Sequence, residues 1–218
     1  PGVLLHLDFE EGFFFQTAVY AGDLGPEQTS NKGFDWRMGG GAGYAWFGEL
    51  GYAYELSGLE GVFKFGGYYS TGEEFTNFQT GGLSSGFGSF YAILDQRILD
   101  AEENGIGLSG FLRAGYAPEQ ETSVVRYYGD AGLVLDNLFL EDDAMGLAVS
   151  YTNFGSDYVT ATRVGGTPVT SSETIIEFTY QAPLFGWLAV QPDLQYIIDP
   201  HFSGRDAFVA GIRAEVLF

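Results

Sequence analysis

Hydrophobic and polar residues alternate with a period of two along most of this chain. The alternation is clear in the last segment, where one face holds Phe208, Ala210, Ile212, Ala214, Val216 and Phe218, and the other holds Val209, Gly211, Arg213, Glu215 and Leu217. Successive side chains of a β-strand point to opposite faces, so this pattern predicts a strand with one apolar and one mixed face. A soluble sandwich would bury the apolar face, whereas a membrane barrel would turn it to lipid and point Arg213 and Glu215 into a wet lumen.

Earlier segments repeat the alternation. Leu188, Val190, Pro192, Leu194 and Tyr196 oppose Gln191, Asp193 and Gln195 in the preceding segment. The same pattern predicts eleven strands in all, at about 2–9, 12–21, 43–55, 61–71, 87–99, 105–117, 124–138, 144–154, 172–182, 187–198 and 206–218. The fold class we expect is therefore all-β.

Strand length and connection length distinguish a soluble sandwich from a membrane barrel. Most predicted strands have 8–14 residues, longer than the roughly 5–6 of soluble strands and close to the length that crosses a bilayer at a tilt. Short connections at 9–12, 56–60, 100–104, 139–143 and 183–186 alternate with longer ones at 22–42, 72–86, 118–123, 155–171 and 199–205. Short periplasmic turns and longer external loops are typical of outer-membrane barrels.

Aromatic residues that would form girdles near the strand ends are Phe13, Tyr52, Tyr54, Tyr69, Tyr116, Tyr180, Trp187 and Tyr196.

An odd number of strands predicts that the barrel is incomplete within this chain. Bacterial single-chain barrels have an even strand number, and open sheet edges are prohibitively costly in hydrocarbon. We therefore expect residues 1–218 to form one domain, the carboxy-terminal part of a transmembrane antiparallel up-and-down β-barrel. An odd number of amino-terminal strands would then lie outside residues 1–218 or be supplied by another chain. A miscount of one strand would instead leave a complete small barrel.

Composition and charge narrow the function classes. The chain has 33 Gly, 20 Phe, 14 Tyr, 3 Trp and no Cys, a balance that favours strands over helices. Its net charge of −20 argues against nucleic acid as a partner, because phosphate binding needs a cationic surface. The acids could attract cations, bridge divalent ions at a lipopolysaccharide surface, or simply keep the loops solvated. No apolar run reaches the roughly 18–20 residues of a membrane helix. The chain begins at Pro1 without a basic and apolar leader, so we expect its start to be processed or truncated.

Candidate chemistry is sparse, and we predict neither an enzyme nor a cofactor. His6 and His201 are the two histidines, too few for the usual His/Cys metal site. We expect His6 to face the lumen and His201 to be a solvated loop residue. The glycine run 39–43 lacks the Lys-Ser/Thr ending of a phosphate loop, and the pair Glu73 and Glu74 has no identifiable catalytic partner. A barrel enzyme of the outer membrane is the alternative from a different class.

Polar residues inside predicted strands are the candidate pore lining. They are Glu49, Lys64, Asp95, Arg97, Arg113, Arg126, Asp130, Glu177, Asp193, Arg213 and Glu215. Interspersed arginines and carboxylates can bind sugar hydroxyls and focus a field across a pore. Alternatively, the opposite charges pair across strands and stiffen the wall without touching a solute. Both interpretations stay open at this point.

The carboxy-terminal third resembles the end of the carbohydrate-selective porin family, OprB. The matching segments are 173–180 (ETIIEFTY), 187–200 (WLAVQPDLQYIIDP) and 206–218 (DAFVAGIRAEVLF), with weaker agreement at 12–22, 63–71, 111–118 and 128–134. The resemblance implies a sixteen-stranded barrel for passive diffusion of monosaccharides and related solutes, in the bacterial outer membrane, as a monomer or homotrimer. It also implies an assembly signal at the matching positions Ile212, Ala214, Val216 and Phe218. The strong acidity, with a net charge of −20, departs from the family pattern.

Three functions follow from these expectations. The first is a passive pore for small carbohydrates, with outer-membrane lipid and lipopolysaccharide as its surroundings. The second is a general or cation-preferring porin, suggested by the charge of −20. The third is a structural barrel component of a larger envelope complex, suggested by the missing strands. Loops 22–42 and 72–86 are the segments that we expect to narrow the pore.

Overall fold

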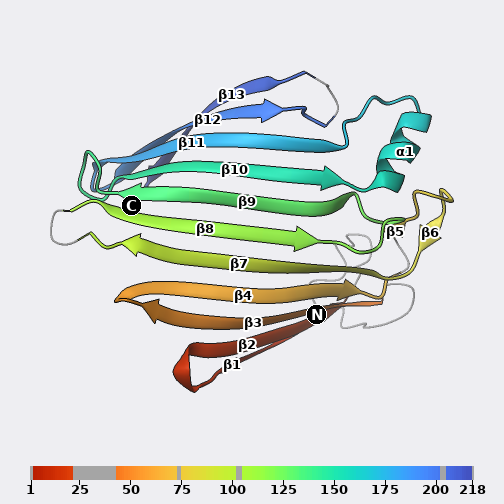
Figure 1. Cartoon of the computed structure of the whole chain (residues 1–218), viewed down its shortest axis with the longest axis horizontal. Coiled ribbons are helices and arrows are strands. Elements are labelled where there is room, and N and C mark those ends of the chain that lie inside the picture. Colours follow the sequence, from red (N-terminus) through yellow and green to blue (C-terminus); the bar gives the residue numbers. More distant parts are fainter. Residues whose placement is uncertain (1, 22–42, 73–74, 102–104, 202–204, 218) are drawn as a thin grey trace, which may run out of the picture.

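The fold is one large antiparallel sheet, seen in a computed structural model that describes residues 2–21, 43–72, 75–101, 105–201 and 205–217. Eleven strands follow one another as an up-and-down meander, each pairing with the next along the chain (Figure 1). Their bounds are β1 Gly2–Asp8, β2 Phe13–Ala21, β3 Tyr44–Leu56, β4 Leu59–Ser70, β7 Phe87–Leu99, β8 Gly107–Tyr116, β9 Val125–Asp136, β10 Ala144–Phe154, β11 Ser172–Phe185, β12 Leu188–Ile198 and β13 Ala207–Val216. The all-β prediction and the order of the eleven predicted strands are confirmed.

The strand ends differ from the predicted ones by a few residues. The largest difference is in β11, which continues past Pro183 to Phe185 and shifts its register against β12 between these two residues. Proline cannot donate to the ladder and is tolerated near such an irregularity, so it does not end the strand. The connection to β12 is consequently shorter than the sequence suggested.

The sheet has one apolar face, which we call the outer face. The pairing register places on it Phe208, Ala210, Ile212, Ala214 and Val216 of β13, and the residues paired with them on β12, which are Tyr196, Leu194, Pro192, Val190 and Leu188. The same rows continue through Ile176 and Phe178 of β11 to Val149 and Leu147 of β10. These side chains are exposed in the isolated chain, Ile212 by 78% and Leu147 by 57%.

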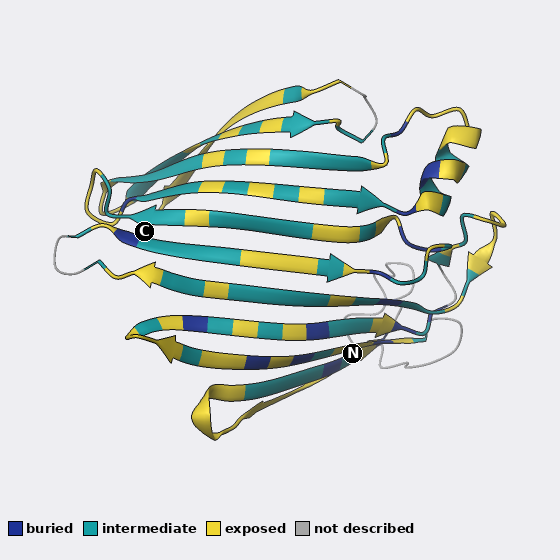
Figure 2. Ribbon diagram, viewed as in Figure 1, coloured by how far each residue is buried: buried dark blue, intermediate teal, exposed yellow. Residues whose placement is uncertain are grey.

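A hydrophobic core of the soluble kind is absent from the described residues. The buried apolar side chains there are only Ala18, Ala21, Ala45, Ala117, Val159 and Val169. Exposed and half-covered positions instead alternate along the middle of β10 and β12, while β1 and β13 are exposed along almost their whole length (Figure 2). A soluble protein could not leave so many large apolar side chains in water, because their burial is its main source of stability. The outer face is therefore a surface for lipid.

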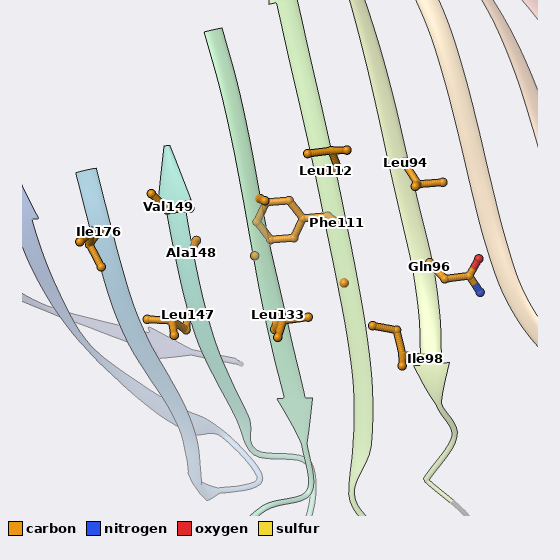
Figure 3. Close-up of a pocket in the computed structure, with 13 residues that line it drawn as sticks. Leu94, Gln96, Ile98, Phe111, Leu112, Leu133, Leu147, Ala148, Val149 and Ile176 are labelled. Carbon is orange, nitrogen blue, oxygen red and sulfur yellow. The ribbon is translucent and has the colours of Figure 1, made fainter. Parts of the chain in front are cut away.

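The middle of the outer face is uneven. A shallow hollow of about 560 Å³ lies across β7 to β11, and its wall is almost wholly apolar. Large side chains on neighbouring strands surround it, among them Leu94, Leu112, Leu133 and Leu147 (Figure 3). Acyl chains of the bilayer can fill a hollow of this chemistry.

The two ends of the sheet differ, as the connection lengths predicted. Short turns lie at one end, while α1 (Ser156–Val164) and the hairpin of β5 (Phe75–Thr76) and β6 (Leu83–Ser84) lie at the other (Figure 1). The longer connections 155–171 and 72–86 contain a helix and a small hairpin, which the sequence pattern did not predict. A single-turn 3-10 helix, η1 (Glu10–Gly12), forms the turn between β1 and β2.

Both outermost strands have an open edge. Within the described residues, β1 pairs only with β2, and β13 pairs only with β12. Strand edges cannot remain unpaired in hydrocarbon, because each unsatisfied backbone group costs several kcal/mol. No helix among the described residues is long and apolar enough to cross a membrane.

The inner face as candidate functional site

The second face of the sheet, which we call the inner face, carries the polar strand residues. The register aligns Arg113 with Asp130, Glu177 with Gln195, and Arg213 with Gln191 across neighbouring strands. By the same pairing, the inner face also carries Glu49, Lys64, Asp95, Arg97, Asp193 and Glu215. Ten of the eleven candidate residues are therefore gathered on one surface. Whether they contact a solute stays a prediction.

Arg126 departs from this set. It lies on β9 beside a register shift between Asn153 and Phe154 of β10. Its guanidinium is 5.6 Å from the ring centroid of Tyr116 and 5.5 Å from that of Tyr127, and these two rings stack on each other on the outer face. Cations are attracted to aromatic faces in this geometry. The placement favours a role for Arg126 at the aromatic rim over one in the pore wall.

Glu49 of β3 is the most enclosed candidate. Its side chain is only 8% exposed, and its two oxygens accept hydrogen bonds from Gln16 Nε2 at 2.7 Å and from Tyr91 Oη at 2.6 Å. Gly66 lies opposite Glu49 on β4, where a Cβ would come within 2.4 Å of the Tyr91 ring. The missing side chain at Gly66 thus lets Tyr91 lie along the wall and reach the carboxylate.

Arg97 is held at the short-turn end of the inner face. Its guanidinium donates to Asp136 and to Ser109 Oγ, the latter at 2.8 Å, and forms an ion pair with Asp100 at 3.2 Å. A Cβ at Gly107 would lie 2.0 Å from Arg97 Nη2, so glycine makes room for the guanidinium there. This arginine fits the interpretation in which opposite charges stiffen the wall.

Arg113 is more available to the lumen. Its ion pair with Asp130 is 3.7 Å long, and nearly half of its side chain is exposed. The guanidinium lies 4.5 Å from the ring centroid of Phe111, while Asp130 also accepts a hydrogen bond from Tyr128 Oη at 2.9 Å. A half-exposed arginine in a long ion pair keeps donors free for a passing solute.

Carboxylates predominate on β11 to β13. The amide of Gln195 donates to both Glu177 and Asp193 at 3.1 Å and so bridges the two acids. Arg213 and Glu215 form an ion pair at 3.5 Å. This part of the inner face therefore has an excess of negative charge.

Lys64 and Asp95 are the least engaged candidates. Lys64 lies between Gly51 and Ile93 in the register, and Asp95 lies between Val62 and Phe111. Neither forms an ion pair or a side-chain hydrogen bond with another described residue. Asp95 is exposed on this face, and Lys64 is half-buried.

The inner face also carries a row of aromatic rings, which sequence reasoning missed. Successive ring centroids are 5.9 Å apart from Tyr20 to Phe47, 4.7 Å from Phe47 to Tyr68, and 6.2 Å from Tyr68 to Phe87. Phe75 of the β5–β6 hairpin then stacks on Phe87 at 5.3 Å. We call these five residues the aromatic row. The signal was present in the alternation, because Phe47 and Glu49 are two residues apart and must share a face.

The longer connections contact one another at the end where α1 lies. Phe78 N donates to Glu121 O at 2.7 Å, and the ring of Phe78 lies 5.1 Å from that of Tyr158 in α1. Tyr158 Oη is 2.9 Å from His201 Nε2. These contacts join loop 72–86 to its neighbours. That it narrows the pore stays a prediction, and loop 22–42 lies outside the described residues.

His201 is a packed residue, so its assignment as a solvated loop histidine was wrong. Its ring lies 3.8 Å from the ring centroid of Phe154, and its backbone N–H donates to Glu173 Oε2 at 2.9 Å. Burial lowers the pKa of His201, although the nearby Glu173 carboxylate acts in the opposite direction. His6 lies on the inner face as expected, opposite Gln16, and its Nε2 is 3.0 Å from Asp8.

Two other predicted features remain untested. Ile212, Ala214 and Val216 lie on the outer face of β13, while Phe218 is outside the described residues, so the assembly signal stays a prediction. Glu73 and Glu74 are also outside them. Among the described side chains, no three His, Cys, Asp or Glu residues are grouped so that they could hold a metal ion.

Comparison with known proteins agrees with this architecture. Two solved structures of OprB from Pseudomonas putida are similar. The high-pH form has a TM-score of 0.82 and 23% identity over 99% of this chain and 58% of that one. The low-pH form has a TM-score of 0.63 and 17% identity, covering 99% and 54%. The chain thus spans little more than half the length of these structures, and no curated protein sequence matches it. The model of the carbohydrate-selective porin, OprB family, matches residues 1–218, and this chain belongs to that family.

Proposed function

We propose that this chain forms part of the wall of a passive pore that admits small carbohydrates through the outer membrane. The observation that carries the proposal is the separation of the two faces over all eleven strands. The outer face is apolar, while the inner face offers carboxylates, amides, hydroxyls and guanidinium groups. Such groups exchange hydrogen bonds with sugar hydroxyls at little net cost, so solutes can bind weakly and leave again.

The family is one of outer-membrane porins, which locates the chain in the bacterial outer membrane. We propose that residues 1–218 are the carboxy-terminal part of a single barrel, and that further strands bridge the open edges of β1 and β13. Closure at sixteen strands would need five more. A homotrimer, or a second chain that supplies these strands, remains a prediction. Lipid and lipopolysaccharide would cover the outer face.

Liposome swelling tests the proposed transport. Vesicles that contain the complete porin should swell in isotonic glucose, and more slowly in a disaccharide, because passage depends on solute size. The proposed role requires no catalytic step, so the sugar should be recovered unchanged. Absence of swelling in glucose, from vesicles whose pores conduct small ions, would contradict a carbohydrate pore.

A cation-preferring pore is the second candidate. Glu177, Asp193 and Glu215 on the inner face, together with the net charge of −20, favour it. Clefts lined by one sign of charge concentrate the opposite ion. The reversal potential in a salt gradient distinguishes the two, since strong cation selectivity without an effect of glucose would favour the second candidate.

A further inference from the structure

We infer that the inner face holds a binding subsite for a single neutral sugar ring, in a hollow in front of Glu49 that is lined by β1, β2, β3 and Tyr91 of β7. The hollow has a volume of about 310 Å³ and is lined by Leu4, Gln16, Tyr20, Phe47, Glu49 and Tyr91. This volume is at the lower end of the roughly 300–1,000 Å³ of small-molecule sites. The hollow therefore fits one sugar ring better than an oligosaccharide. The inference rests on the proposed function and adds a specific place to it.

The apolar part of the hollow is unusual for a pore wall. Tyr20 and Phe47 are each 42% exposed on the inner face, where the lumen of a porin is otherwise polar. Exposed apolar patches on a wet surface mark binding grooves. Aromatic faces suit the C–H face of a sugar ring, which is apolar although its edge is ringed by hydroxyls.

The polar part of the hollow is built around a buried carboxylate. Gln16 Nε2 and Tyr91 Oη fix Glu49 from two sides at 2.7 and 2.6 Å. Each carboxylate oxygen keeps a further lone pair, and the Gln16 amide keeps a second N–H and its own carbonyl oxygen. A hydroxyl that donates to Glu49 and a second that accepts from Gln16 can thus bind without disturbing the network. An anionic solute would be repelled by the carboxylate, whereas the aromatic rings and hydrogen-bonding groups beside it suit a neutral sugar ring.

The aromatic row supplies a route to this hollow. Rings from Phe75 in the β5–β6 hairpin to Tyr20 follow one another at 4.7 to 6.2 Å. The row therefore crosses β7, β4, β3 and β2 near the loop end of the sheet and ends at the hollow. A sugar can move along it in short steps while one face stays covered by aromatic carbon.

Sugar block of single-channel current in the complete porin tests the subsite. Phe47→Leu removes the ring but keeps an apolar side chain, and Glu49→Gln keeps the shape but removes the charge. Each should raise the glucose concentration that halves the current by roughly three- to tenfold, the size of one lost contact. Phe65→Leu on the outer face of β4 is the matched control and should leave the concentration unchanged.

The outcomes separate the subsite from the proposed function. If glucose blocks the wild-type pore but Phe47→Leu and Glu49→Gln are blocked equally well, the subsite is wrong and the sugar pore stands. If glucose does not affect wild-type channels that conduct normally, both are contradicted. Conductance without sugar shows that each variant has folded into a pore.

Discussion

Asp143 shows how single residues fix this barrel wall. Its side chain is 1% exposed and accepts hydrogen bonds from the backbone N–H groups of Leu138, Phe139 and Leu140, and from Tyr180 Oη at 2.6 Å. Burial by itself would raise the pKa of Asp143, but these four donors outweigh it and lower the pKa from 3.8 to about 2. Ionised Asp143 therefore stabilises the turn between β9 and β10.

The lowered pKa of Asp143 determines how the stability of this turn depends on pH. A carboxyl whose pKa is lowered in the folded state contributes its full stability above its ordinary pKa, and loses that stability as the pH falls toward the folded value. We expect Asp143→Asn to lower the unfolding temperature at neutral pH, and the difference from wild type to shrink between pH 4 and pH 2. Asp142→Asn is the control, because Asp142 is exposed in the same turn. Equal effects of the two substitutions would contradict this role for Asp143.

At the residue scale, the sequence predicted the face of the sheet on which a side chain lies better than it predicted the residues that this side chain contacts. Glu177 and Arg213 were placed on the inner face by alternation alone, because side chains of a strand must alternate. The contact between Glu49 and Tyr91 could not be predicted, because it joins residues 42 positions apart and depends on the register of β3, β4 and β7. The departure of Arg126 depends on a bulge, which has no reliable sequence signal.

At the scale of elements, β10 shows how one strand contributes to both faces. Val149 is paired with Ala131 and Ile176 on the outer face, and Ser150 is paired with Asp130 and Ile175 on the inner face. Arg on the lipid face of a barrel strand costs about 2–4 kcal/mol near the bilayer midplane. We expect Val149→Arg to reduce the free energy of unfolding by about that amount in phospholipid vesicles. Ser150→Arg should change it far less, and similar losses for both would contradict the assignment of faces.

Helix α1 depends on tertiary contacts, which explains why sequence did not predict it. Its sequence, SDYVTATRV, contains several β-branched residues that are poor helix formers. Packing of Tyr158 against Phe78 and His201 supplies what local propensity lacks. The strands could be predicted from the sequence without such contacts, because their length and alternation already specify them.

The contact of α1 with His201 makes a testable prediction. We expect His201→Ala to speed amide hydrogen exchange in residues 156–164, while His6→Ala leaves it unchanged. Burial lowers the pKa of His201 below 6.5, so the neutral form favours the packed loop. The stability of this cluster is therefore complete above pH 6.5 and decreases as the pH falls below it. Unchanged exchange in His201→Ala would contradict a structural role for this histidine.

At the scale of the whole molecule, the sheet has the reverse of a soluble protein's arrangement, because its apolar face is exposed and its polar strand residues gather on the inner face. Its large apolar side chains lie on the outside, and the largest fully buried side chains among the described residues are Asp143, Ser70 and Ser123. We propose that lipid covers the outer face and that further strands pair with β1 and β13. Sequence predicted this architecture because alternation, strand length and connection length all agree. Pore width could not be predicted, since it depends on how distant loops pack.

The most direct test of the central claim is chemical modification of single cysteines in the conducting pore. The chain has no cysteine, so Glu177→Cys on the inner face and Phe178→Cys on the outer face each give one reactive thiol. A charged, membrane-impermeant thiol reagent should react with Glu177→Cys and reduce the single-channel current, while Phe178→Cys, covered by lipid, should be unaffected. Reaction and current loss at Phe178→Cys, with Glu177→Cys protected, would show that the inner face does not line the pore.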